Sequence, residues 1–407
     1  MDFEYSPRQK EIVARVSAFM DEHVYPAIPV YEQQQEAGER WKVIPVVEEL
    51  KAKARAAGLW NMFMPPSSGH PPVDDTFEFE GVQLTNLEYA PVAELMGRVS
   101  FASEVFNCSA PDTGNMEVLN RYGSRAQKER WLRPLMNGEI RSAFLMTEPA
   151  VASSDATNIE TRIERDGDDY VINGRKWWSS GVGDPRCKVA IVMGKIDPDA
   201  APHQQQSQVL VPLDAPGVRI LRMLPVFGYD DAPHGHAEVV LENVRVPVAN
   251  RLGDEDGQGF FQLMANLPQE RLSIAVAAVA AAETVLDATI EYCRNRQAFG
   301  RNIGSFQNTR FVLAELSTEV EIARHYVDKC VLALNAKELT VVDAAKAKWW
   351  TTEIQQKVID RCLQLHGGYG YMTEYPVAKA WMDSRVQTIY GGTTEIMKEI
   401  IGRSFGF

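Results

Sequence analysis

The stretch that decides the fold class is residues 170–178, YVINGRKWW, in which Asn173-Gly174 lies between two runs of strand-forming residues. An Asn-Gly pair in this setting predicts a β-hairpin turn. A polar, proline-containing loop is predicted at 197–206. Further strands are predicted where β-branched and other apolar residues concentrate, at 189–193, 208–212 and 237–241. The middle of the chain is therefore predicted to be a β domain.

On both sides of this region, apolar residues recur with the spacing of helices. Residues 65–72 are rich in Pro, Ser and Gly and are predicted to form a loop, and Gly58 is predicted to end the helix before it. We expect a helical domain at 1–142, a β domain at 143–256 and a helical bundle at 257–407. The predicted helices are 7–22, 46–57, 84–96, 126–135, 272–296, 309–336, 341–365 and 394–401.

Composition excludes several classes of function. The formal net charge of -13 argues against nucleic-acid binding, which needs clustered Lys and Arg. The longest purely apolar run, residues 274–282, is far shorter than the roughly 20 residues that span a bilayer. The acidic start does not resemble a signal peptide. Five scattered cysteines predict reduced thiols and a cytoplasmic protein, with neither a disulfide framework nor a metal site.

Two segments carry residues suited to a ligand. Residues 144–155, FLMTEPAVASSD, form a loop of small and hydroxyl-bearing residues whose backbone amides suit an anionic or polar ring system; the alternative is a plain linker between domains. Residues 176–181, KWWSSG, place two tryptophans on opposite faces of a strand. The outward tryptophan is suited to stacking on a flat cofactor, and the alternative is that both simply pack.

These segments, together with others, resemble the acyl-CoA dehydrogenase family. The C-terminal half is similar to long-chain and isovaleryl-type members. The N-terminal half, through residues 101–116 and 151–157, is similar to animal members that also carry a kinase-like domain. The Thr-Glu-Pro loop is one residue longer than the common family form. The matching segments are MTEP (146–149), INGRKWWSSG (172–181), RQAFG (296–300), FQ (306–307), QLHGGYG (364–370) and IYGGTTEI (389–396).

The resemblance implies a fold and a reaction. The fold is mainly α with a central β domain: an N-terminal helical domain, a β-barrel or sandwich, and a C-terminal four-helix bundle. The reaction is FAD-dependent α,β-dehydrogenation of an acyl-CoA to the trans-2-enoyl-CoA, as in fatty-acid β-oxidation, with hydride transfer to flavin N5. Electrons would pass to an electron-transfer flavoprotein, and the enzyme would be a homotetramer, a dimer of dimers.

The resemblance also implies where the catalytic base lies. Many members carry a glutamate at the position of Gly391, which has no side chain here. The long-chain and isovaleryl branch carries it on an earlier helix, at the position of Glu270, which we therefore expect to remove the α-proton. The alternatives are a solvated glutamate or one paired with Arg271. Glu395 is a rival by proximity, although the family uses that position for the cofactor.

The remaining site residues are carried over from the same motifs. For each of them the alternative is packing, an exposed helix end or a glycine helix stop. Thr394 is also predicted to cap the last helix. Thr147 is expected at the pyrimidine side of the flavin, Trp178 over the ring, Ser180 at N5 and Arg296 at the FAD pyrophosphate of a neighbouring subunit, and the N–H of Gly391 at the thioester carbonyl. The expected cofactor residues are Phe144, Met146, Thr147, Ser153, Ser154, Trp178, Ser180, Arg296, Phe299, Gln307, Gln364, Leu365, Gly367, Gly368, Thr393, Thr394 and Glu395. The expected substrate residues are Ser154, Gln269, Arg271, Tyr390, Gly391 and Gly392.

Two other functions remain open at this stage. One is an acyl-CoA oxidase that returns its electrons to oxygen, and the other is an inactive homologue that acts in assembly. The acyl group is not defined by the motifs, although the C-terminal similarity favours longer or branched chains.

Overall fold

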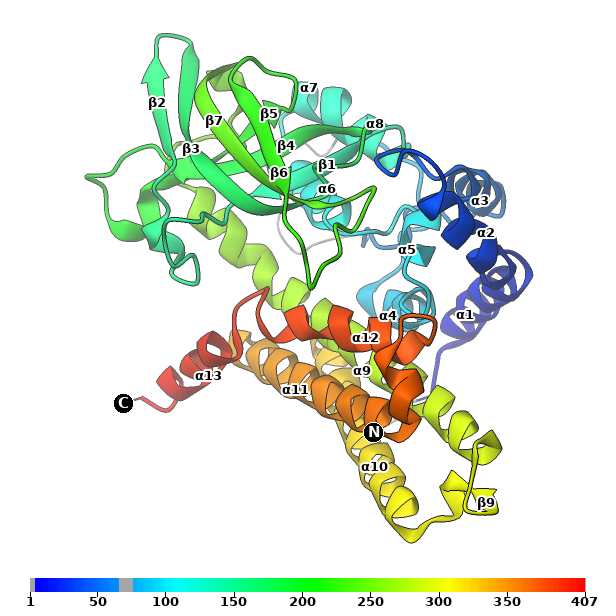
Figure 1. The fold of residues 1–407 in the computed structure, drawn as a ribbon. Helices are drawn as coiled ribbons and strands as arrows, with labels where there is room; N and C mark the ends of the chain where they lie inside the picture. The colour runs from blue at the N-terminus through cyan, green and yellow to red at the C-terminus, as the bar shows by residue number, and fades with distance from the viewer. Residues whose placement is uncertain (1–3, 66–75, 407) are drawn as a thin grey trace. The chain divides into compact units, whose positions relative to one another are not determined.

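A computed structural model describes residues 4–65 and 76–406, and most of the loop predicted at 65–72 lies outside them. The chain divides into two compact units (Figure 1). One, the helical unit, contains residues 1–17, 85–100 and 267–407. The other, the sheet unit, contains residues 18–84 and 101–266.

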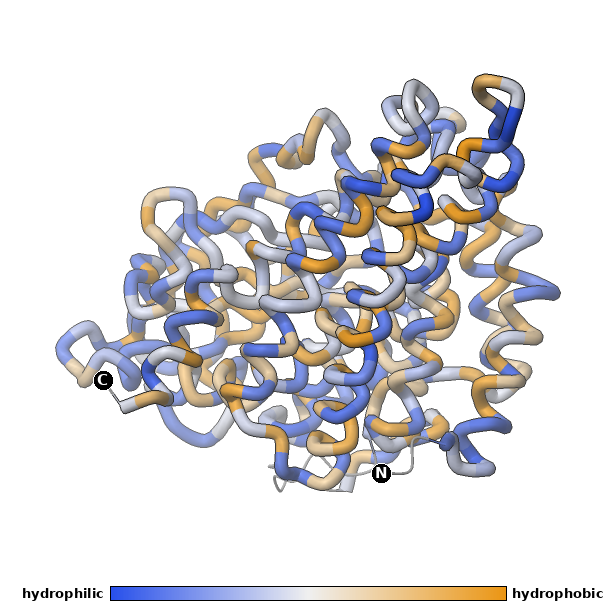
Figure 2. The backbone as a smooth tube through the Cα atoms, turned by 90° about the horizontal axis from the view of Figure 1, so that it is seen from below, coloured by the Kyte–Doolittle hydropathy of each residue, from blue (hydrophilic) through white to orange (hydrophobic). Residues whose placement is uncertain are grey.

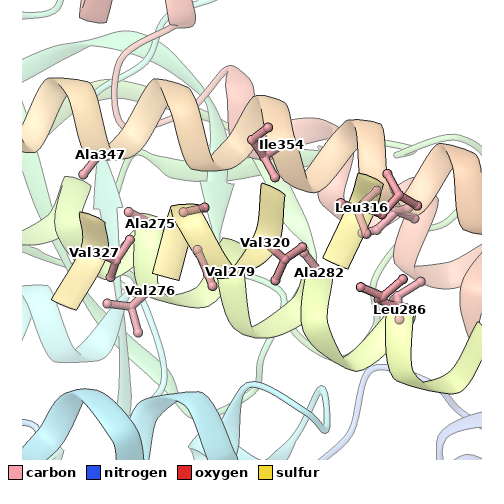
Figure 3. Packing of buried hydrophobic residues seen from close by; sticks show 14 of the residues in the cluster. Ala275, Val276, Val279, Ala282, Leu286, Leu316, Val320, Val327, Ala347 and Ile354 are labelled. Atoms are coloured by element: carbon pink, nitrogen blue, oxygen red, sulfur yellow. The ribbon is translucent and has the colours of Figure 1, made fainter. Parts of the chain in front are cut away.

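The helical unit is built on three long helices that pack by their apolar faces. Its helices are α1 (Pro7–Phe19, the last two residues of which belong to the sheet unit), α4 (Asn86–Met96), α9 (Gly259–Asn295, from Leu267 on), α10 (Gln307–Asn335), α11 (Val341–His366), α12 (Pro376–Ser384) and α13 (Thr394–Arg403). Small residues of α9, such as Ala275 and Ala282, meet Val320 of α10 and Ala347 of α11 (Figure 3). Such small side chains permit close packing of helices around one core.

By length and composition, α9 qualifies as a membrane-spanning helix. Half of the apolar window that gives this result is buried inside the protein, and its side chains belong to the core just described. A buried core helix has the same composition as a membrane span. Hydrophilic and hydrophobic residues are interspersed along the backbone, as expected for helices that bury one face (Figure 2).

The sheet unit encloses a second core within one seven-stranded sheet. The strand order is β1-β4-β2-β3-β7-β6, with β5 paired to β4. Apolar side chains such as Tyr170, Ile172 and Val239 are completely buried between the strands. The strands are β1 (Arg141–Leu145), β2 (Arg162–Asp166), β3 (Asp169–Ser180), β4 (Cys187–Lys195), β5 (Gln206–Pro212), β6 (Val218–Met223) and β7 (His236–Pro247).

The same unit also contains helices, which come before the strands in the chain. They are the π-helical turn η1 (Met20–Val24), α2 (Tyr25–Glu36), α3 (Pro45–Ala56), α5 (Ala102–Val105), α6 (Asp112–Tyr122), α7 (Arg125–Gln127), the π-helical turn η2 (Lys128–Leu132) and α8 (Arg133–Met136). The sequence pattern did not predict α2, α5, α6, β1, β2, β6 or α12. It also ended the first helix at residue 22, whereas the helical path continues through η1 into α2.

The predicted hairpin turn at Asn173-Gly174 is wrong. Strand β3 runs straight through both residues, and the turn that joins β2 to β3 lies at Gly167-Asp168. Gly174 serves another purpose, because a Cβ there would lie 2.2 Å from the hydroxyl oxygen of Thr161. The glycine therefore permits a close approach within the sheet instead of a reversal of the chain.

Candidate functional site

The predicted base, Glu270, lies on α9 of the helical unit. Its side chain is exposed to solvent, yet burial raises its pKa, and the positive charge of Arg271 only partly opposes this shift. No hydrogen bond or ion pair to its carboxylate is found within residues 4–65 and 76–406. Such a group is a stronger base than an ordinary glutamate and is free to accept a proton.

Arg271 does not form the ion pair with Glu270 that was the alternative reading. Its side chain is buried, and its Nε donates to the carbonyl oxygen of Gly391 at 3.0 Å. Its Nη1 is buried and has no hydrogen-bond partner among the described residues. One end of the guanidinium therefore holds the Gly391-Gly392 turn, and the other retains an unused donor.

The Gly391-Gly392 turn needs both glycines. Their φ angles are 65° and 100°, a region that favours glycine. A Cβ on Gly391 would lie 2.6 Å from Ile274 Cδ1, and one on Gly392 would lie 2.5 Å from Met397 Cε. The structure thus brings together Arg271, Gly391 and Gly392, three residues of the predicted substrate site.

Lys348, which was not predicted as a site residue, also holds the Gly391-Gly392 turn. Lys348 of α11 is completely buried, and its Nζ donates to the carbonyl oxygen of Gly392 at 2.7 Å. Burial lowers the pKa of Lys348 to about 8; Arg271 adds to this effect, while Glu395 and Glu353 oppose it. Two cations from two helices therefore bind two consecutive carbonyl groups.

The residues after this turn begin α13. Thr393, and not Thr394, caps the helix: its hydroxyl accepts the N–H of Ile396 at 3.3 Å. Thr394 is buried and donates to Glu353 at 3.1 Å, which leaves it no capping role. Glu395 is exposed in the first turn, where its own backbone N–H and the hydroxyl of Thr393 lower its pKa. A lowered pKa makes Glu395 a weaker base than Glu270.

Tyr390 and Gln269 flank these groups in the sequence. Tyr390 is 45% exposed, and its hydroxyl donates to Gln387 at 2.8 Å. Gln269 is half-buried next to Glu270 on α9. Their substrate-facing role stays a prediction.

In the sheet unit, hydrogen bonds to buried polar groups hold the Met146-Thr147-Glu148 segment in place. Lys176 donates to the carbonyl oxygen of Met146 at 2.8 Å, and the backbone N–H of Trp177 donates to that of Thr147 at 2.9 Å. Glu148 accepts hydrogen bonds from Lys176 and from the backbone and hydroxyl of Thr161. Phe144, Met146 and Thr147 are each half-buried at the edge of this scaffold.

The two serines of the loop differ in availability. The hydroxyl of Ser153 accepts the N–H of Glu148 at 3.0 Å and closes the loop, whereas Ser154 is exposed. Ser154 is thus the serine that is free to meet a ligand from solvent.

Trp178 and Ser180 lie at the end of β3. Trp178 has a φ of 52° at a register shift of the sheet and is 44% exposed, while its neighbour Trp177 is half-buried. The hydroxyl of Ser180 lies 2.8 Å from Nδ1 of His236, which the sequence did not single out. An exposed indole beside a hydroxyl offers a stacking surface and a polar contact for a flat ring.

The predicted pyrophosphate site lies at the ends of α9, α10 and α11. Arg296 is exposed and lies over the ring of Tyr369 at 5.1 Å; no carboxylate pairs with it among the described residues. Phe299 is 94% exposed, and Gln307 is an exposed residue at the start of α10. An unpaired guanidinium beside exposed aromatic side chains suits a phosphate and a heterocycle.

The glycine pair after α11 ends that helix and also leaves space. Gly367 is the C-cap with a φ of 57°, and its N–H donates to the carbonyl oxygen of Gln364. A Cβ on Gly367 or Gly368 would meet nothing within 4 Å, so neither glycine is required by packing. Gln364 is exposed, and Leu365 packs on the helical core.

A cavity of about 530 Å³ in the sheet unit contains none of the predicted site residues. Glu148, Thr161 and Trp177 line it, and Arg175 and Arg222 on its rim both form ion pairs with Glu238. Because both guanidinium groups are already paired with Glu238, we assign no ligand to the cavity.

Comparison with known proteins identifies the family. The N-terminal, middle and C-terminal domain models of acyl-CoA dehydrogenase match residues 6–139, 143–244 and 257–406. The chain is 45% identical to the probable acyl-CoA dehydrogenase FadE2 of Mycobacterium tuberculosis, over 99% of this chain and 97% of that protein. It is 42% identical to acyl-CoA dehydrogenase family member 11 of Gallus gallus, over 98% of this chain but about half (51%) of that protein.

Solved structures agree with this result. A putative acyl-CoA dehydrogenase from Mycobacterium abscessus superposes with a TM-score of 0.92 at 40% identity, covering 99% of both chains. The predicted resemblance and the predicted fold class are therefore confirmed: the chain belongs to the acyl-CoA dehydrogenase family.

Proposed function

We propose that this protein is an FAD-dependent acyl-CoA dehydrogenase in which Glu270 removes the α-proton of an acyl-CoA thioester. The observation that carries the proposal is the environment of Glu270. Glu270 is an exposed carboxylate whose pKa is raised, and the residue after it, Arg271, holds the Gly391-Gly392 turn. The α-carbon of a thioester is a weak acid, so the reaction needs a strong base and donors at the thioester carbonyl. The N–H of Gly391 is the donor we assign to that carbonyl.

The residues present fit FAD. The exposed indole of Trp178 and the hydroxyl of Ser180 suit the flavin, and Thr147 its pyrimidine edge. The unpaired Arg296 suits the pyrophosphate, and the open glycines at 367–368 suit the adenosine side. When bound, FAD supplies the acceptor for the β-hydride. The chain's own residues bind and orient the thioester, hold the α-proton on Glu270 and keep the Gly391 turn in place.

Further parts of the proposal concern partners. An electron-transfer flavoprotein is the proposed acceptor, and the proposed assembly is a homotetramer in which Arg296 and Gln307 complete a neighbour's FAD site. Five free, buried cysteines support a reducing, cytoplasmic location. Fatty-acid β-oxidation is the proposed pathway, with a longer or branched acyl chain.

The decisive experiment mixes the purified holoenzyme with a panel of acyl-CoAs and follows bleaching of the flavin absorption band. Bleaching by at least one saturated acyl-CoA, with enoyl-CoA as product, is expected. Rapid reoxidation by oxygen with hydrogen peroxide release would identify an oxidase, whereas reoxidation by a dye or an electron-transfer flavoprotein identifies a dehydrogenase. Protein that binds no FAD, or FAD that no acyl-CoA reduces, would contradict the proposal.

A further inference from the structure

Three polar side chains in the sheet unit, Ser180, His236 and Asp231, form a line of close polar contacts, and of these only Ser180 belongs to the family motifs. Ser180 is the last residue of β3 and His236 the first of β7, and the sheet pairs them directly across the two strands. The hydroxyl oxygen of Ser180 lies 2.8 Å from Nδ1 of His236. On the other side of the ring, Nε2 lies 3.3 Å from Oδ2 of Asp231.

The loop that carries Asp231 is held tightly. Asp231 has a φ of 53°, and its carbonyl oxygen accepts the N–H of Gly235 at 2.9 Å. A Cβ on Gly235 would lie 2.8 Å from both Met223 and Trp41, so the loop cannot shift easily. The ring of Trp178 lies 6.1 Å from that of His236. The imidazole is therefore positioned by Ser180 and Trp178 on β3 and by Asp231 in the loop.

The hydrogen-bond roles follow from the chemistry of the partners. An ionised carboxylate only accepts, so Asp231 favours the hydrogen of the neutral imidazole on Nε2. Nδ1 then accepts from the hydroxyl of Ser180. Exposure rises along the line: the side chain of His236 is 26% exposed and that of Asp231 is 54% exposed. The line thus connects a half-buried serine to solvent.

We propose that Ser180, His236 and Asp231 form a proton relay that carries the proton from flavin N5 to solvent when the cofactor is reoxidised. This inference rests on the proposed function, in which Ser180 meets N5. Reoxidation by the electron-transfer flavoprotein would remove two electrons from the cofactor, and the hydrogen delivered to N5 as hydride would then leave as a proton. Ser180 accepts this proton at its oxygen while its own hydroxyl proton moves to Nδ1. The proton on Nε2 then leaves to Asp231 and water, so one proton enters and one leaves.

His236→Asn tests the relay, because asparagine retains a polar partner for Ser180 but cannot pass a proton between two ring nitrogens. The rate of flavin reoxidation by the acceptor is expected to fall at least about tenfold. The rate of flavin reduction by acyl-CoA is expected to stay within about twofold of wild type. Added imidazole should restore part of the reoxidation rate. Equal reoxidation rates in His236→Asn and wild type would overturn the relay.

Neighbouring aspartates supply a matched pair. Asp231→Asn leaves the Ser180–His236 contact intact and is expected to slow reoxidation less than His236→Asn does. Asp230→Asn is the control, because Asp230 pairs with Arg40 and not with the imidazole. Asp231 is exposed, so its substitution keeps the test valid even where His236→Asn does not retain FAD. Identical reoxidation rates in the two aspartate variants would contradict the inference.

A readout independent of turnover is the chemical shift of flavin ¹⁵N5 in enzyme reconstituted with labelled FAD. Ser180→Ala is expected to shift this resonance strongly and His236→Asn more weakly. An unchanged resonance in Ser180→Ala would show that the hydroxyl does not meet N5. Wild-type enzyme that no acyl-CoA reduces would refute the proposed function itself, whereas normal reduction with unaffected reoxidation in the variants would refute only the relay.

Discussion

Two glutamates from the family motifs, Glu148 in the sheet unit and Glu270 in the helical unit, lie in opposite environments. Glu148 is 3% exposed and accepts hydrogen bonds from Lys176, Thr161 and the backbone of Glu160. Burial alone would raise its pKa, but Lys176 and these hydrogen bonds lower it below the usual range. Glu270 is exposed, lacks such partners, and has a raised pKa because burial dominates.

The difference separates a structural carboxylate from a reactive one. A carboxylate whose oxygens are all engaged, and whose charge is stabilised, is a poor base and a good anchor. A desolvated carboxylate without donors is a good base and contributes little to folding. Substitution of each glutamate should therefore affect a different property of the protein.

The largest expected effect is on turnover in Glu270→Gln. The amide cannot take the α-proton, so flavin reduction by acyl-CoA should fall by about 10²–10⁴-fold, while FAD and acyl-CoA still bind. Stopped-flow bleaching of the flavin measures this directly. The matched control is Glu291→Gln, an exposed glutamate on the same helix that pairs with Arg294. Near-normal reduction in Glu270→Gln would place the base elsewhere.

Glu148→Gln should affect stability instead. The substitution leaves the completely buried ammonium of Lys176 without its counter-charge, and breaking one side of such a pair typically costs about 3–5 kcal/mol. Denaturant unfolding of the purified variant measures this loss. Double substitution with Lys176→Met removes both charges and should recover part of the stability. A variant as stable as wild type would show that the pair does not hold the 146–148 segment.

A tenfold effect is expected for Lys348→Met, which removes the donor to Gly392 from the turn beside Glu270. Losing a charged hydrogen bond of this kind costs about 1.5–3 kcal/mol, part of which should appear as a rate loss of about tenfold. Lys51→Met is the control, because Lys51 also donates to a glycine carbonyl, that of Gly138 at 3.1 Å, away from the predicted site. Equal flavin reduction rates in both variants would exclude a role for Lys348 in the turn.

Sequence reasoning reached the fold class because it depends on motifs that lie in order along the chain, whereas the roles assigned to Glu270 and Gly391 stay predictions. It could not find Lys348, which sits in an alanine-rich helical segment where a lysine normally faces solvent, or His236, whose partner Ser180 lies 56 residues away. The hairpin error at Asn173-Gly174 has the same origin. The need for glycine there comes from Thr161, a contact between strands that local sequence does not reveal.

The smallest expected effect, on the pH dependence of stability, distinguishes the two glutamates by its sign. Glu148 has a lowered pKa, so its contribution is present above the pKa of the unfolded chain and is lost as the pH falls. The pKa of Glu270 is raised, so its protonated form is favoured in the folded state, and that contribution is lost as the pH rises through its folded pKa. The folding stability of wild type should therefore exceed that of Glu148→Gln most clearly at neutral pH, and the difference should shrink in acid. Glu270→Gln should match wild type in acid and be slightly more stable than it at neutral pH. Thermal unfolding of the three proteins between about pH 4 and pH 8 measures both trends. Parallel curves for the two variants would mean that the two carboxylates do not differ in the way their surroundings indicate.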